Sequence, residues 1–379
     1  MKRKIAAAAA ALLILSGCDT AGPDPEQTKE PEETPSRPAF SQIDAADRPV
    51  VSPEEAGLEI FELPNYAGSP DEVVIIGWDE RGDAVVYYHP GTRSVRLAPL
   101  EGQADRFVCE LTPERGDIYP FSVAWHEGRI LYLEDDLSPE RGEWSLYVVD
   151  ADGERRRIDS EADHPDYAPF PGLPSCDGDR AVWIGGGIEH SRAVSSIFCT
   201  RLDVGGREVV ARLPADGELS FGGAVVDGDC VYYDVGNYSG DRHVYMYNLS
   251  GGVTEELPAP GELCDLAAAG GALAARDVES GDILVYDFAA GEWLTALEGM
   301  YSEPYLADGW LCCAGTGAGL TALRLADNTA VELVPPGSDV QAVIQGVYGP
   351  LLCWREYDGE FGADWGFTER IALLPPAEE

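Results

Sequence analysis

Short apolar runs separated by polar turns make up almost the whole chain after residue 57. Each run is rich in Val, Ile, Leu and Tyr and is bounded by Gly, Asp or Pro. Runs of this kind between such turn residues are typical of β-strands. No stretch of useful length has the 3.6-residue periodicity of an amphipathic helix. The pattern therefore predicts an all-β protein.

The runs repeat as hairpins along the chain. Seven times, an apolar run meets a tight turn that contains glycine, and a second apolar run follows at once. Successive turn glycines are 39 to 50 residues apart, the length of one four-stranded blade. The seven glycines are Gly82, Gly128, Gly178, Gly228, Gly270, Gly309 and Gly349.

A second hairpin recurs in the repeating unit, for example at residues 145–154, 244–251 and 283–291. Its turn contains Asp or Asn and then Gly, because Asp and Asn tolerate the turn conformation and Gly supplies positive φ. Each unit is thus strand a, Gly turn, strand b, longer loop, strand c, Asp/Gly turn and strand d, the meander of a β-propeller blade. Over residues 57–374 this pattern resembles the periplasmic TolB-like and WD40-like β-propellers. The resemblance implies an architecture and carries no catalytic residues, and most units lack the Trp-Asp dipeptide of true WD40 repeats.

The last unit predicts only three strands, near 340–345, 351–356 and 367–374. The apolar run at 58–63 has no unit of its own. We therefore expect this N-terminal strand to complete the last blade, which hides a strand edge that would otherwise promote aggregation. The predicted fold is a seven-bladed β-propeller. A six-bladed ring with one additional hairpin is the alternative.

The first residues have the pattern of a bacterial lipoprotein signal. Basic residues at positions 2–4 precede an apolar run at 5–15, which is too short to span a bilayer. The sequence Leu-Ser-Gly-Cys that ends at Cys18 resembles a lipobox, in which the cysteine becomes lipid-modified and N-terminal. We expect a lipid anchor on Cys18 at the extracytoplasmic face of a bacterial cell membrane. An ordinary secretory signal that contains a cysteine is the alternative.

The sequence predicts four consecutive segments. Residues 1–17 are the signal peptide, and residues 18–56 are the lipidated N-terminus and a disordered tether. The tether is rich in Pro, Glu and Thr and has almost no aliphatic residues, so it cannot bury enough surface to fold. Residues 57–374 form the propeller, and residues 375–379 are a C-terminal tail.

The chain is strongly acidic. It has 26 Lys and Arg against 68 Asp and Glu, a formal net charge of −42, which repels nucleic acids and anionic lipid head groups. The expected partners are the membrane, through the lipid on Cys18, and an unidentified protein or carbohydrate. After the signal, Lys29 is the only lysine. A GC-rich genome explains this bias, and a halophilic habitat is the alternative explanation.

Eight cysteines remain besides Cys18. An even number in an exported protein suggests disulfides, but most of the eight lie inside apolar strand-like runs, where free cysteine packs as a small hydrophobe. We expect mostly free, buried thiols, with one or two disulfides as the alternative. The eight are Cys109, Cys176, Cys199, Cys230, Cys264, Cys312, Cys313 and Cys353.

The longest loops are expected on one face of the ring. The a–b and c–d turns share one face and are short, whereas the b–c and d–a loops share the other and include the long polar segments 135–143, 160–174, 185–193, 234–243, 299–304 and 357–366. Functional residues of a rigid scaffold usually lie on such loops. The alternative is that these loops are simply solvated, each with a local aromatic anchor. The expected binding residues are Tyr167, Tyr238, Tyr357, Trp365, Asp166, Asp241 and Asp358.

Other candidate chemistry is weaker. Charged residues recur at the exit of strand b, where they could line the channel mouth and bind a cation or could merely end a strand: Glu134, Asp234, Arg276 and Arg355, then His89, Asp135, Asp277 and Glu356. The five histidines are scattered, so no metal or other cofactor is predicted. No Gly-x-Ser-x-Gly elbow or Walker loop is present.

The sequence therefore predicts a membrane-anchored binding or scaffolding module for a protein or carbohydrate. One alternative is a cell-surface glycoside hydrolase or lyase that uses paired channel carboxylates. Another is an accessory subunit of an envelope complex. No catalytic residue is identified by the sequence.

Overall fold

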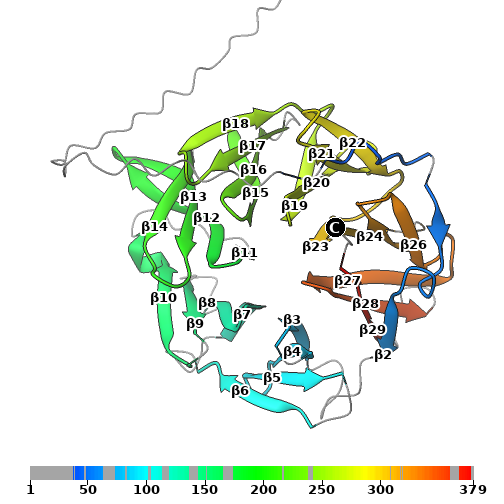
Figure 1. Cartoon of the computed structure of the whole chain (residues 1–379). Helices are drawn as coiled ribbons and strands as arrows, with labels where there is room; N and C mark the ends of the chain where they lie inside the picture. The colour runs from blue at the N-terminus through cyan, green and yellow to red at the C-terminus, as the bar shows by residue number, and fades with distance from the viewer. Residues whose placement is uncertain are drawn as a thin grey trace, which may run out of the picture. The chain divides into compact units, whose positions relative to one another are not determined.

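The computed structural model describes residues 37–376 apart from 38, 47, 63–72, 82, 101–103, 113–118, 136–143, 151, 165–173, 216, 238–241, 308, 316, 318 and 359–366. These residues belong to one compact unit, Arg37–Glu379. Its strands form seven sheets arranged in a ring (Figure 1). The predicted seven-bladed β-propeller is confirmed, and the six-bladed alternative is wrong.

Each sheet is one blade, in which strands a to d follow one another outward from the centre of the ring. Blades 1 to 4 each contain four consecutive strands. They are β3 (Val74–Asp79), β4 (Ala84–His89), β5 (Ser94–Pro99) and β6 (Arg106–Glu110); β7 (Tyr119–His126), β8 (Arg129–Asp135), β9 (Trp144–Val149) and β10 (Arg155–Ser160); β11 (Ser175–Asp177), β12 (Arg180–Glu189), β13 (Arg192–Arg201) and β14 (Arg207–Pro214); and β15 (Leu219–Asp227), β16 (Cys230–Asn237), β17 (Arg242–Asn248) and β18 (Val253–Leu257).

Blades 5 to 7 complete the ring, and the last two also receive strands from the N-terminal side. They are β19 (Leu263–Ala269), β20 (Ala272–Asp277), β21 (Ile283–Asp287) and β22 (Glu292–Leu297); β23 (Tyr305–Ala307), β24 (Trp310–Gly315), β25 (Gly319–Arg324), β26 (Thr329–Val334) and β1 (Val50–Val51); and β27 (Val340–Tyr348), β28 (Leu351–Asp358), β29 (Phe367–Leu373) and β2 (Glu59–Glu62). Within the described residues, the only helical segment is the 3-10 turn η2 (Glu161–Asp163).

The N-terminal strand closes the ring as predicted. Strand β2 pairs antiparallel with β29, and Glu59 lies opposite Leu373. The seventh blade therefore has the order β2-β29-β28-β27, with its outer strand from the beginning of the propeller and its inner three from the end. Tyr348 adds a second link, because its hydroxyl donates to the carbonyl of Ile75 in blade 1 at 3.1 Å.

One of the expected long loops is instead a continuous hairpin. Residues 185–193 were expected to form a polar loop, but β12 and β13 pair without interruption from Arg180 to the two-residue turn His190-Ser191. Both turn residues have positive φ, 49° and 66°, as in the tight turns that match the twist of paired strands. Gly185 is required inside β12, because a Cβ there would lie 2.9 Å from the ring of Phe198. Gly185 therefore serves strand packing and does not form a loop.

The expectation of a disordered tether as far as residue 56 is wrong for its last part. The described residues from 37 to 58 form a strap, which contacts blades 4 to 7 and follows the outer rim of the ring past β22 and β26 to β2 (Figure 1). Gln42 donates to the carbonyl of Leu325 at 2.7 Å, and Asn328 donates to the carbonyl of Asp44 at 2.9 Å. Strand β1 then pairs in parallel with β26. A few apolar residues in a polar stretch are enough to hold the strap because the blades already present apolar edges to them.

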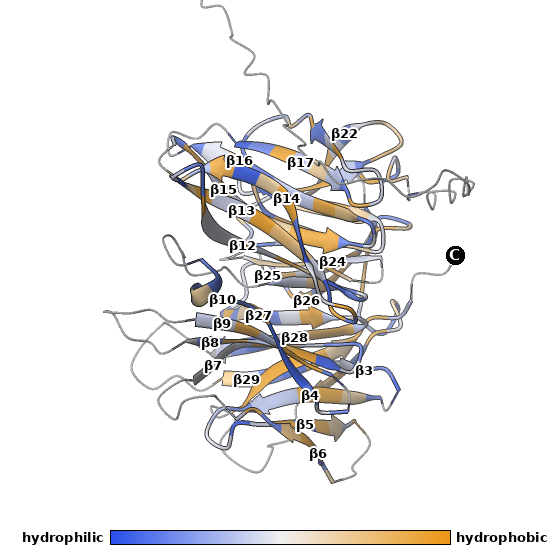
Figure 2. Cartoon of the chain, turned by 90° about the vertical axis from the view of Figure 1, so that its left-hand side faces the viewer, coloured by the Kyte–Doolittle hydropathy of each residue, from blue (hydrophilic) through white to orange (hydrophobic). Residues whose placement is uncertain are grey.

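The hydrophobic core is divided among the junctions between blades. Because side chains alternate along a strand, each blade has two apolar faces, and each face packs against the neighbouring blade. The strap contributes Phe40 and Ile43 to the junction of blades 5 and 6, and Ala56 and Leu58 to the junction of blades 6 and 7. Figure 2 shows apolar segments in many of the strands, including β4, β13 and β14.

The cysteines follow the same alternation. Cys312 and Cys313 are consecutive in β24, and one packs in the junction with blade 7 and the other in the junction with blade 5. All eight described cysteines are free thiols, and five of them are buried, which confirms the expectation of mostly free, buried thiols. Among the described residues, no helix has the length and apolar character of a membrane span.

Candidate functional site

The binding residues expected on the long-loop face, the face of the b–c and d–a loops, are mostly not described. Tyr167, Tyr238, Trp365, Asp166 and Asp241 lie outside the described residues, as does Cys18. Tyr357 and Asp358 end strand β28, where the backbones of Tyr357 and Phe367 pair. The ring of Tyr357 packs on that of Phe367, with ring centroids 5.9 Å apart. This contact lies within the seventh blade. The proposed convergence of these aromatics stays a prediction.

Five of the eight charged residues at the exits of strand b form ion pairs within the described part of the chain. Arg355 donates to Glu369 at 2.7 Å, and Arg276 lies 2.6 Å from Asp265. The carboxylate of Asp234 is almost fully buried and binds Arg242, yet burial outweighs this arginine and raises the pKa of Asp234. These residues therefore stabilise individual blades. Glu134 and Glu356 follow the same pattern, with Arg155 and Arg370 at 2.9 Å.

Arginine also stacks on aromatic rings in this protein. The guanidinium of Arg155 lies 3.7 Å from the ring centroid of Tyr147, and that of Arg207 lies 4.5 Å from the centroid of Phe198. The planar guanidinium can stack its face on a ring and donate from its edge to a carboxylate, whereas an ammonium has no flat face to stack. Replacement of these arginines by lysine would therefore not be conservative.

The most deeply buried charged cluster is centred on Asp159 at the junction of blades 2 and 3. This carboxylate is 0% exposed and accepts from the indole of Trp183 at 2.8 Å and from Arg207 at 2.7 Å. The Nε2 atom of His164 lies 3.0 Å from the same carboxylate, and its ring packs against Phe198. Asp159 and His164 are both buried, so the cluster orders the end of β10.

No group of three potential metal ligands comes together within the described part of the chain. Of the three histidines expected on the long-loop face, His164 is held by Asp159, and His243 binds Glu256 through Nδ1 at 2.8 Å. His190 lies in the tight turn between β12 and β13. These positions place the three in different local environments.

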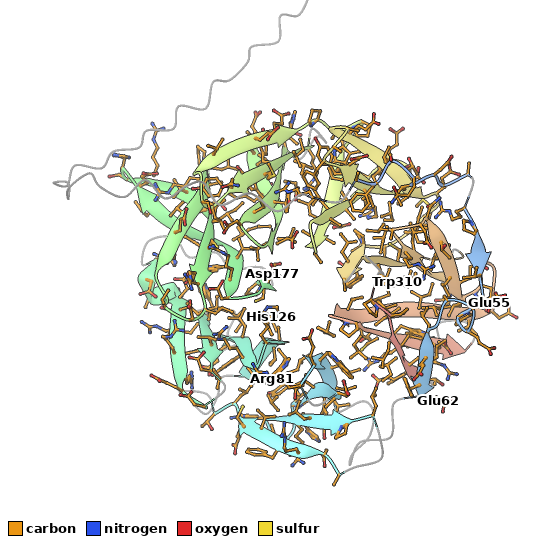
Figure 3. All side chains as sticks on the ribbon, viewed as in Figure 1. Glu55, Glu62, Arg81, His126, Asp177 and Trp310 are labelled. Atoms are coloured by element: carbon orange, nitrogen blue, oxygen red, sulfur yellow. The ribbon has the colours of Figure 1, made fainter. Side chains whose placement is uncertain are left out.

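A large cavity opens on the opposite, short-turn face, which carries the a–b and c–d turns. This mouth cavity has a volume of about 1140 Å³. Residues at the a–b turns of six blades line it, so it lies on the axis of the ring, and it extends outward between blades 1 and 2. Figure 3 shows Arg81, His126 and Asp177 along the inner side of three successive blades.

The mouth is charged on one side only. The last residue of strand a, which precedes each a–b turn, is ionisable in blades 1 to 4 and not charged at neutral pH in blades 5 to 7. In order these residues are Asp79, His126, Asp177 and Asp227, then Ala269, Ala307 and Tyr348. Alignment of the seven turns on their glycines would have revealed this asymmetry in the sequence. Loop length instead predicts a binding site on the long-loop face.

Two of these carboxylates also connect neighbouring blades. Asp177 accepts the backbone N–H of Gly228 at 2.5 Å, and Asp227 accepts that of Gly271 at 2.8 Å. Burial, with a smaller contribution from Asp177, raises the pKa of Asp227. Asp227 is not among the residues that line the mouth cavity. Its position indicates a structural contact between blades 4 and 5.

The thiols in the wall of the cavity are not activated. Burial raises the pKa of Cys109 to about 11, and burial together with Asp177 raises the pKa of Cys176 to about 12. Both side chains are therefore protonated at neutral pH, whereas the thiolate is the nucleophilic form of cysteine. The cavity has no candidate cysteine nucleophile among its described residues.

Comparison with known proteins supports the fold alone. No model of a protein family matches the chain, and no curated sequence matches it. A structure of a prolyl endopeptidase is similar, with a TM-score of 0.54 and 13% identity over 81% of this chain and 51% of that chain. A puromycin-hydrolyzing peptidase of Mycobacterium tuberculosis has a TM-score of 0.51 and 13% identity over 80% of this chain and 54% of that one.

TolB of Acinetobacter baumannii is also similar, with a TM-score of 0.40 and 17% identity over 65% of this chain and 62% of that chain. A TM-score this low carries no argument about function. The chain spans about half the length of the two peptidases. At these identities, what the chain shares with the peptidases is the β-propeller fold.

Proposed function

We propose that this chain is a lipid-anchored, extracytoplasmic binding module whose ligand, a protein or a carbohydrate, enters the mouth cavity. The observation that carries the proposal is the cavity itself. It is open, lies on the axis of the ring, and has acidic residues beside aromatic and apolar ones. Small numbers of polar groups in a partly apolar concave site are typical of ligand pockets. The anchoring part rests on the lipobox that ends at Cys18.

A glycoside hydrolase or lyase is the second candidate. It needs two neighbouring carboxylates, one of them with a raised pKa, in an accessible cleft. Asp177 and Asp227 meet part of this requirement because they lie on successive a–b turns and the pKa of Asp227 is raised. However, Asp227 is outside the cavity lining, and both carboxylates already accept backbone N–H groups. We therefore favour binding without catalysis.

An accessory role in an envelope complex is compatible with the same binding site. In that case the ligand of the mouth cavity is another envelope protein. This candidate differs from a carbohydrate-binding module only in the class of ligand.

A ligand panel tests the proposed function. The chain with Cys18→Ala is screened by thermal shift and calorimetry against oligosaccharides and short peptides. Binding is expected to be lost in Glu127→Arg, at the cavity, and retained in the matched control Glu255→Arg, on the outer strand β18. Cleavage of a glycan that stops in Asp177→Asn would favour the enzyme. Binding that survives Glu127→Arg would place the ligand site elsewhere.

A further inference from the structure

We propose that the mouth cavity recognises a peptide through a basic side chain, arginine or lysine. This inference rests on the proposed binding function and specifies its ligand. It follows from the charge, the apolar surface and an unsatisfied polar atom in the same cavity.

The charge of the cavity favours a cation. Five carboxylates and two arginines line it, namely Asp79, Glu80, Glu127, Asp150 and Asp177 with Arg81 and Arg106. One of the five, Asp150, is already paired with Arg129 at 3.2 Å. Arg106 reaches Asp79 only at 3.8 Å. Glu80 and Glu127 form no ion pair with any described residue. A concave site lined by one sign of charge concentrates the field and attracts a ligand of the opposite sign.

The apolar surface of the cavity suits the stem of a basic side chain. Phe107 is 55% exposed although it lines the cavity, and Trp125 stands in the wall beside it. Trp125 packs closely on Gly77. A Cβ added to Gly77 would lie only 2.5 Å from the Cβ of Trp125, so the position of Trp125 depends on this glycine. Arginine and lysine combine an apolar stem with a charged head, and both favour the face of an aromatic ring. A simple inorganic cation would leave this aromatic surface unused.

A polar atom in the wall also lacks a partner. The Nε2 atom of His126 is buried and makes no hydrogen bond within the described part of the chain, and the residue lines the cavity. The ring lies in the cavity wall, but its Nε2 atom is shielded from solvent, so a ligand supplies the missing partner only when the ring turns toward the cavity. Each peptide unit carries both a donor and an acceptor, so a peptide satisfies either tautomer of this histidine.

The chain's own tether does not fit the site. Residues 19–36 contain six acidic residues and a single basic one, Lys29. Arg37, the next basic residue, is already bound elsewhere: its guanidinium lies 4.1 Å from the ring centroid of Phe288 and donates to the thiol of Cys230 at 2.6 Å. The expected occupant is therefore another polypeptide.

Fluorescence anisotropy with two labelled peptides tests the inference. One is a ten-residue Gly/Ser peptide with two arginines, and the other carries the neutral isostere citrulline at both positions. The protein is the full chain with Cys18→Ala. We expect the arginine peptide to bind at least tenfold more tightly than the citrulline peptide, with an affinity that falls as salt is raised.

Matched variants separate the cavity from the general acidity of the chain. Glu80→Gln with Glu127→Gln is expected to weaken binding of the arginine peptide about tenfold, because both carboxylates attract its cationic side chains. Phe107→Ala is expected to weaken it further. Glu255→Gln with Glu292→Gln removes the same charge from the outer strands β18 and β22 and is expected to leave binding unchanged.

Four results would overturn the inference. Equal affinity for the two peptides would show that the positive charge is not recognised. An equal loss of binding in the two double variants would show that only the bulk charge acts. Oligosaccharide binding that Glu127→Arg abolishes, without peptide binding, would retain the binding function and exclude the basic peptide. If no probe binds, both this inference and the proposed function are wrong.

Discussion

Replacement of Phe40 by alanine is expected to destabilise the propeller, although sequence composition alone places this residue in a tether. The side chain is 3% exposed and belongs to the core between blades 5 and 6. Phe→Ala in a core costs about 3–5 kcal/mol. The strap can detach without unfolding the blades, and its docking energy limits the loss, so we expect the lower end, about 3 kcal/mol.

The expected change in Tm follows from the size of the folded unit. An unfolding entropy of ~2.1 cal/mol/K per residue over roughly 340 residues gives about 0.7 kcal/mol/K, so a loss of 3 kcal/mol lowers Tm by about 4 °C. Thermal unfolding followed by circular dichroism measures this shift in the chain with Cys18→Ala. The control is Val50→Ala, because Val50 lies in the same strap but is 56% exposed, and its loss is expected to cost less than about 0.5 kcal/mol.

The comparison with Val50→Ala decides between two descriptions of the N-terminal region. If Phe40→Ala and Val50→Ala unfold at the same temperature as the parent chain, the strap contributes nothing to the folded unit. The tether would then reach residue 56, as composition alone suggests, and the strap described here would be refuted.

Four further predictions concern the anchor, the closure and the buried carboxylates. Cys18→Ala is expected to leave the membrane fraction, and retention after alkaline carbonate washing would contradict the lipid anchor. Deletion of Glu59–Glu62 exposes the edge of β29 and is expected to cause aggregation on heating, whereas deletion of 19–36 should leave Tm unchanged. Arg242→Ala removes the cation from buried Asp234 and is expected to lower the free energy of unfolding by about 3–5 kcal/mol in urea titrations at pH 7. Asp227→Asn should stabilise the chain at pH 7, because the raised pKa of Asp227 means that its charged form opposes folding; the advantage over wild type should shrink as the pH falls through that pKa, and an advantage independent of pH would exclude this cause.

The repeating part of the fold could be predicted because each blade obeys local rules. The turn glycines fix the hairpins, and the missing fourth strand of the last unit together with the unassigned run before the first one predicts the closure. The strap could not be predicted in this way. Its anchors, Phe40 and Ile43, are isolated apolar residues in a polar segment, and they fold only because the junction of blades 5 and 6 offers them a surface.

The candidate site was harder to predict than the fold. Loop length predicts a site on the long-loop face, whereas the mouth cavity lies on the face with the shortest turns. Its lining combines residues far apart in sequence, such as Phe107, His126 and Tyr348, and only the curvature of the ring brings them together. Residue type and spacing carry no information about that curvature.

The strap also determines how the propeller would respond to mechanical force. If a membrane holds the N-terminus, tension enters the folded unit at Arg37 and reaches Phe40, Ile43 and β1 before it reaches β2. The strand that closes the ring therefore lies downstream of several independent attachments. A pull that detaches the first residues of the strap lengthens the free segment between the membrane and the propeller. The seventh blade stays intact during this step, because β2 is still paired with β29. The contacts of the strap would therefore break before those of the strand that closes the ring.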